Sequence, residues 1–112
     1  MKYYHALYMS EELLSKKAEI LDKFENDKWQ IEKYLIVLAK NHKNHLEFLN
    51  SVLLIQKSIN KDDLFVIGIA NGEQGAMELI EKITQEVYDE TESTDIRNYI
   101  LQKQKEFEEG NV

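Results

Sequence analysis

The chain has 112 residues, of which 43% are hydrophobic and 31% charged, a balance typical of one globular domain of about 100–150 residues. It contains no cysteine, which excludes disulfides, thiolate metal sites and cysteine nucleophiles. Its net charge is −7 and Arg97 is its single arginine. We therefore expect no nucleic-acid partner, because nucleic-acid binding depends on Lys and Arg that neutralise phosphates.

No stretch approaches the ~18 consecutive apolar residues of a membrane helix. Residues 1–5 also lack the apolar core of a secretory signal. We therefore expect a cytoplasmic protein with no membrane segment.

The first predicted element is a strand over residues 2–9, where tyrosines and other apolar side chains alternate between two faces. Ser10 is expected to cap the following helix, and Glu11 and Glu12 suit the positive end of its dipole. Apolar residues recur at spacings of three and four over residues 11–24, which predicts an amphipathic helix. The unbroken apolar run at residues 34–39 then favours a strand buried on both faces over a helix, which the absence of Pro and Gly would also allow.

The segment from Asn44 to Asn60 fits two patterns. Phe48 and Val52 belong both to a helical spacing and to a two-residue period with one break at Asn50. We expect a helix, although the sequence leaves open whether all of residues 44–60 are helical.

The apolar run at residues 64–70 predicts a further strand, which Asn71 and Gly72 end. Helical spacing from Ala76 to Val87 predicts an amphipathic helix after it. A polar break then separates this helix from a last one over residues 95–108.

The predicted order β-α-β-α-β-α-α makes residues 1–112 a single small three-layer α/β domain. It would contain about three mainly parallel strands with helices on both faces. The last helix has no strand to follow, so it packs either on the sheet or on a partner. A spare amphipathic helix makes the chain a candidate homo-oligomer.

In an open parallel sheet, ligands bind outside the carboxyl ends of the strands. The strand-to-helix turns at residues 8–11, 41–45 and 71–75 would then meet at one edge. Their polar residues and glycines are the candidate ligand-binding residues: Ser10, Asn41, His42, His45, Asn71, Gly72, Glu73 and Gly75.

The third turn has two interpretations. Gly72 and Gly75 follow a strand and open a helix, which is the context of a phosphate-binding turn, but Gly68 lies inside the predicted strand. The first gap is nevertheless too long for a dinucleotide-binding fingerprint, and Glu73 would repel an anion. In the alternative, Gly72 supplies a positive-φ turn and Gly75 allows close helix–sheet packing.

Catalytic and metal chemistry have little support in the sequence. His42 and His45 are three residues apart and could share a helix face, but a metal would need a third ligand from elsewhere. Ser10 lacks the G-x-S-x-G context of an exposed nucleophile. We therefore assign no catalytic residue, no metal site and no cofactor.

Acidic residues concentrate between Glu86 and Glu109, with eight acids against three bases. This excess is either a solvated helix face or a docking surface for a basic partner. The sequence thus favours a non-enzymatic interaction or regulatory module that self-associates or binds another protein. The alternative is a small enzyme or binding protein that holds an anionic or nucleotide-like ligand at the three turns.

Overall fold

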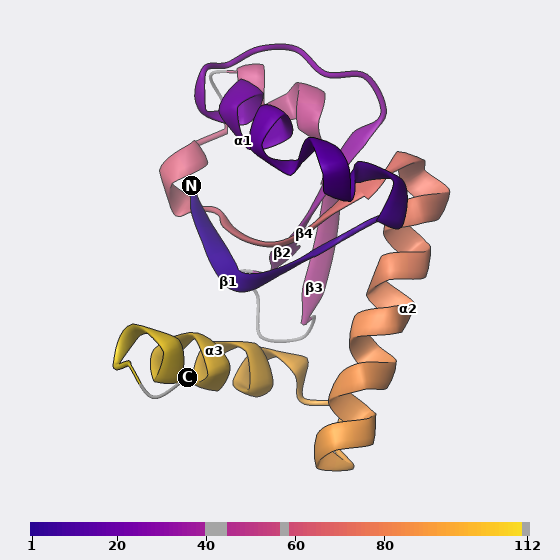
Figure 1. The fold of residues 1–112 in the computed structure, drawn as a ribbon, viewed down its shortest axis with the longest axis vertical. Coiled ribbons are helices and arrows are strands. Elements are labelled where there is room, and N and C mark those ends of the chain that lie inside the picture. Colours follow the sequence, from indigo (N-terminus) through magenta and orange to yellow (C-terminus); the bar gives the residue numbers. More distant parts are fainter. Residues whose placement is uncertain (40–44, 57–58, 111–112) are drawn as a thin grey trace.

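A four-stranded sheet in the order β1-β4-β2-β3 lies at the centre of the computed structural model, which describes residues 1–39, 45–56 and 59–110 (Figure 1). The strands are β1 (Lys2–Met9), β2 (Lys33–Leu38), β3 (Leu46–Asn50) and β4 (Phe65–Asn71). β1, β2 and β4 confirm the strands predicted from the sequence to within one residue at each end.

The strand directions make the sheet mixed rather than mainly parallel. β1 and β4 are parallel, whereas β2 is antiparallel to both of its neighbours, β4 and β3. The predicted order of three mainly parallel strands is therefore wrong. The connection from Leu38 to Leu46 is too short for a parallel crossover, which needs about a dozen residues or more, so β2 and β3 pair as a hairpin.

The helix predicted in residues 44–60 is wrong for residues 46–50, which form a strand. β3 occupies the first part of this segment, and a short 3-10 helix, η2 (Ser51–Ile55), follows it directly. Leu46 and Phe48 pair across the sheet with Leu38 and Ile36. At Asn50 the side chain accepts a hydrogen bond from the Val52 N–H (3.1 Å), which ends the strand. The two-residue period is therefore confirmed from Leu46 to Asn50, whereas Val52 and Leu54 lie in the 3-10 helix.

The helices are α1 (Lys17–Glu25), α2 (Gly72–Thr91) and α3 (Ile96–Glu108). A 3-10 helix, η1 (Glu11–Lys16), precedes α1, so the predicted helix over residues 11–24 starts as a tighter turn. A further short 3-10 helix, η3 (Lys61–Asp63), leads into β4.

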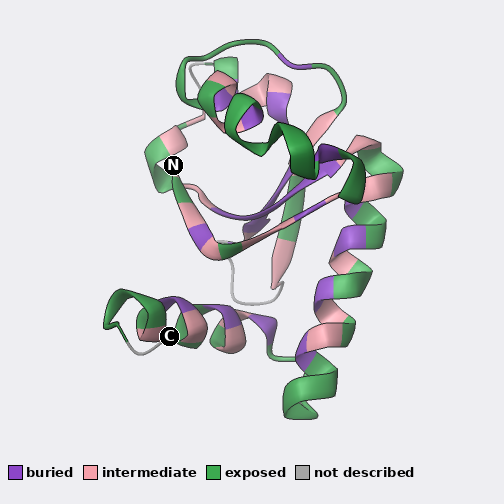
Figure 2. Cartoon of the chain, viewed as in Figure 1, coloured by how far each residue is buried: buried purple, intermediate pink, exposed green. Residues whose placement is uncertain are grey.

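Two apolar clusters lie on opposite faces of the sheet, and Figure 2 shows β2 and β4 as its most buried strands. Alternate residues of β2 divide between them, with Ile36 on one face and Leu35 and Val37 on the other. The first face is covered by α2 and α3 and the second by η1, α1 and η2. The apolar side of α3, with Ile96 and Ile100, is thus used within the chain itself.

A bulge in β4 changes which face its residues occupy. Ile36 of β2 pairs with Gly68 but Val37 pairs with Val66, so Ile67 is an extra residue on β4. A Cβ built on Gly68 would lie 3.1 Å from Leu79 Cδ2 of α2 and 3.2 Å from the Tyr8 carbonyl oxygen. A side chain at this position would require α2 and β1 to move away from β4 by a few tenths of an ångström.

We expect Gly68→Ala to destabilise the protein by about 1–3 kcal/mol, because a methyl group would meet both a backbone oxygen and the α2 side chain. Urea denaturation followed by circular dichroism measures the change. The control is Gly75→Ala, whose Cβ would lie 3.4 Å from Ser10 Oγ, an ordinary contact. That helical substitution should be neutral or stabilise by up to about 1 kcal/mol. Equal effects of the two substitutions would contradict the close approach at Gly68.

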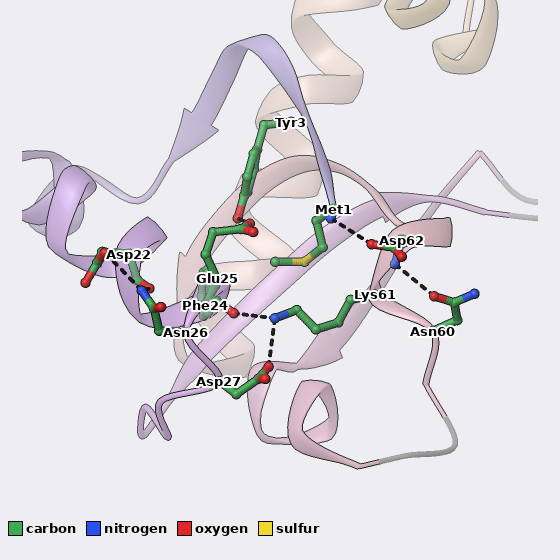
Figure 3. A network of polar contacts seen from close by, with 10 residues as sticks. All are labelled: Met1, Tyr3, Asp22, Phe24, Glu25, Asn26, Asp27, Asn60, Lys61 and Asp62. Atoms are coloured by element: carbon green, nitrogen blue, oxygen red, sulfur yellow. Dashed lines mark hydrogen bonds and ion pairs between the residues drawn. The ribbon is translucent and has the colours of Figure 1, made fainter.

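Lys61 joins η3 to the end of α1, in the network shown in Figure 3. Its Nζ donates to the Phe24 carbonyl oxygen (2.6 Å) and pairs with Asp27 Oδ1 (2.8 Å). The lysine side chain is 19% exposed, so this cation is shielded more than an ordinary surface lysine. A cation at a helix C-terminus also suits the dipole of α1.

We expect Lys61→Met to cost about 1–3 kcal/mol of unfolding free energy, because the Phe24 carbonyl loses a charged donor. Lys23→Met is the matched control, since Lys23 forms only an exposed i,i+4 pair with Glu19 (3.2 Å). The control should cost no more than about 0.5 kcal/mol. Thermal and urea unfolding report both values, and a larger loss in the control would argue against this anchoring role.

Candidate functional site

The parallel pair β1 and β4 brings two of the predicted site residues together. Ser10 directly follows β1, and its Oγ accepts a hydrogen bond from the N–H of Asn71, the last residue of β4 (3.0 Å). Asn71 Nδ2 in turn donates to Glu12 Oε1 (3.2 Å). Ser10 was predicted to cap the next helix, but its side chain makes no capping hydrogen bond to η1. It ties the ends of the two strands together instead.

The start of α2 has few free backbone N–H groups with which to bind an anion. Gly72 has φ +77°, the positive-φ turn considered from the sequence. Its N–H donates to the Glu32 carbonyl oxygen (2.6 Å), and the Asn71 N–H is used by Ser10. Glu73 adds a carboxylate in the first turn. Two backbone donors that a phosphate would need are therefore already engaged.

Gly75 lies on the wall of an open hollow between η1 and α2, beside Ser10. The hollow has a volume of about 580 Å³, and its charged lining residues are Glu11, Glu12, Glu78 and Lys82. Hydrogen bonding by its backbone and by Asn71 lowers the pKa of Glu12, which keeps this carboxyl ionised. Three carboxylates against one ammonium group make this hollow acidic.

His45, from the second predicted turn, lies away from this edge. Because β2 is antiparallel to β4, its carboxyl end is at the opposite end of the sheet. His45 stands there beside the start of α3, where its Nδ1 accepts from the Arg97 N–H (3.4 Å) and lies 3.9 Å from Asp95 Oδ1. Arg97 Nη2 donates to the Ala39 carbonyl oxygen at the same place. Asn41 and His42 lie outside the described residues.

The predicted site therefore divides into two parts. Ser10, Asn71, Gly72, Glu73 and Gly75 gather around the β1 and β4 ends, and His45 helps to fasten the β2–β3 hairpin to α3. Within residues 1–39, 45–56 and 59–110, no group of three His, Asp or Glu side chains is placed to hold a metal ion.

The acidic hollow continues along α2. A second hollow of about 430 Å³ shares Lys82 with the first, and a third of about 270 Å³ shares Glu90 with the second. The three follow one side of α2 and end against α3. Together they form what we call the α2 groove. Its ionisable carboxyl and amino side chains are six acids and two lysines: Glu11, Glu12, Glu78, Glu86, Asp89, Glu90, Lys82 and Lys103.

Tyrosines lie beside the carboxylates of this groove. Tyr99 donates its hydroxyl to Glu90 Oε2 (2.7 Å). Burial and hydrogen bonding to Glu86 raise the pKa of Tyr8, and burial with the nearby charges of Glu86 and Glu90 raises the pKa of Tyr4 to about 12. These phenols stay protonated at neutral pH. One oxygen of Glu86, Oε2, is buried without a hydrogen-bond partner.

Reasoning from the sequence found only part of this arrangement. The excess of acids after Glu86 marked half of the α2 groove, but Glu11, Glu12 and Glu78 fall outside that range. Tyr4 and Tyr8 share one side of β1, and here they stack inward with ring centroids 6.0 Å apart. The role of Arg97 had no sequence signal beyond its being the single arginine.

None of the helices in the described part of the chain is long and apolar enough to cross a membrane. Comparisons with models of protein families, with curated proteins and with solved structures found no match to this chain.

Proposed function

We infer that this protein is a non-catalytic interaction module whose α2 groove binds an extended, basic segment of a partner protein. The observation that carries this inference is the row of three neighbouring hollows along α2, which six carboxylates and two lysines line. From Glu78 to Glu90 the groove follows about 18 Å of helix, the length of about five residues of extended chain.

The electrostatics of the groove support a cationic occupant. Carboxylates lined up on one helix repel each other, and a basic segment relieves that repulsion. The protonated phenols of Tyr8 and Tyr99 hold their carboxylate partners in place without neutralising them.

The alternative of an anionic ligand at the turns has weaker support. The Asn71 and Gly72 N–H groups are occupied, and Glu11, Glu12 and Glu73 stand nearby. A carboxylate about 4 Å from a phosphate costs about 1 kcal/mol in water and more where water is excluded. The carboxylates near these turns would instead attract a positively charged ligand.

We expect a fluorescent peptide of about six residues with alternating Lys and Ala to bind the protein, while a Glu–Ala peptide does not. Fluorescence anisotropy measures the affinity. Glu78→Lys places a positive charge in the groove and should weaken binding by about fivefold, the effect of about 1 kcal/mol. Raising the salt concentration should weaken binding further.

Glu81→Lys is the matched control, because Glu81 is exposed on the same helix but does not line the groove. It should change the affinity less than about twofold. Equal weakening by the two substitutions would mean that the peptide responds only to overall charge. That result, or no binding at low salt, would overturn the proposed groove.

A further inference from the structure

The two edges of the sheet differ in how well their outward backbone groups are protected from pairing with another strand. β1 forms one edge and β3 the other. The register of β1 against β4 shifts between Tyr3 and Tyr8, and Figure 1 shows the strand bent at this point. The His5 N–H of β1 donates to Oε1 of the buried Gln104 of α3 (2.8 Å). A bend and a covering helix are two of the ways in which proteins prevent an edge from pairing.

Among the described residues, β3 has neither a register shift nor a hydrogen bond from a helix to its backbone, and its one charged side chain is Glu47. Its five residues pair with β2 without a register shift, and it contains no lysine or proline. Within the part of the chain that the structure describes, no strand pairs with its outer edge. Phe48, at its centre, is 38% exposed.

The hydrogen bonds of the hairpin show which groups of β3 point outward. Ala39 N–H donates to the His45 carbonyl oxygen (3.1 Å). In an antiparallel pair the bonded positions alternate, so Glu47 and Leu49 direct their backbone groups toward β2. Leu46, Phe48 and Asn50 therefore direct their N–H and carbonyl groups away from the sheet.

We propose that a second copy of this chain pairs with β3, edge to edge and antiparallel, with Phe48 opposite Phe48 of the second copy. This register joins the two four-stranded sheets into one through about six backbone hydrogen bonds. It is a surface distinct from the α2 groove and does not depend on the function proposed for that groove.

The side chains of β3 suit this register. Phe48 lies on the face of Ile36, its partner in β2, and its ring is 6.0 Å from that of Tyr34. The two copies would therefore cover each other's aromatic pairs. On the opposite face, Glu47 of each copy would lie across from Leu49 of the other, so the two carboxylates do not face each other directly.

The net charge of −7 gives the dimer a recognisable salt dependence. Two acidic copies repel each other at long range, and at 0.15 M salt this repulsion is screened beyond about 8 Å. Because the contact itself is made by backbone groups and aromatic rings, salt should strengthen the dimer. A basic segment in the α2 groove responds to salt in the opposite direction.

Analytical ultracentrifugation of the full chain from ~5 µM to ~1 mM tests the proposal, because a short edge gives a weak, reversible contact. We expect the mass to rise with concentration from 13.2 kDa toward twice that value. The rise should occur at lower protein concentration in high salt. A mass that stays at 13.2 kDa throughout would overturn the proposal.

Phe48→Lys should weaken the dimer at least about tenfold, because it removes the ring contact and sets two like charges opposite each other. Met77→Lys is the control, since Met77 is an exposed apolar residue of α2 (48%) and the charge change is the same. It should leave the dimer at wild-type strength. Circular dichroism verifies that both variants fold, and equal effects of the two would overturn the proposal.

Amide hydrogen exchange by NMR identifies the edge itself. The amides of Leu46, Phe48 and Asn50 should become protected as concentration rises. Those of Glu47 and Leu49 already bond to β2 and should not change. A dimer that leaves the Phe48 amide unprotected would place the contact elsewhere and overturn the proposal.

Discussion

β4 pairs with β1 along one side and with β2 along the other, and apolar clusters cover both of its faces. Its backbone groups are therefore used in pairing with both neighbours, and its side chains are buried on both faces. Val66 and Ile69 lie on the α1 side, and Ile67 and Ala70 lie on the α2 side. The bulge at Ile67 and the absence of a side chain at Gly68 allow α2 to pack closely against this strand. β1, β2, α2 and η1 all contact β4 directly, so their positions depend on this strand.

The mixed strand directions around β4 decide where the polar residues go. The parallel partner, β1, ends beside the end of β4, so Ser10 and Asn71 meet and the groove along α2 begins there. The antiparallel partner, β2, ends at the far side, so His45 is used to fasten the hairpin to α3. A mainly parallel sheet would have gathered all three turns at one edge.

The same topology leaves two distinct surfaces for partners. Along α2, carboxylates outnumber lysines, which suits a basic segment. At the other side of the sheet, the straight strand β3 presents outward backbone groups and the exposed Phe48, which suit a second copy. The two contacts should respond to salt in opposite directions. Salt weakens the attraction between opposite charges in the α2 groove, and it screens the repulsion between two acidic copies that meet at β3.

Local patterns in the sequence determined the strands β1, β2 and β4, the helices α2 and α3, and the positive φ of Gly72. A two-residue or helical spacing matched the element that formed in β1 and α2, and a short unbroken apolar run matched β2 and β4. Residues 46–55 carried two competing periodicities, and pairing with β2 selected the strand. Strand direction and the assembly of Glu11, Glu78 and Glu90 into one groove depend on contacts between distant residues. Only the tertiary structure could decide these, because no local pattern records which edge of β4 a strand will join.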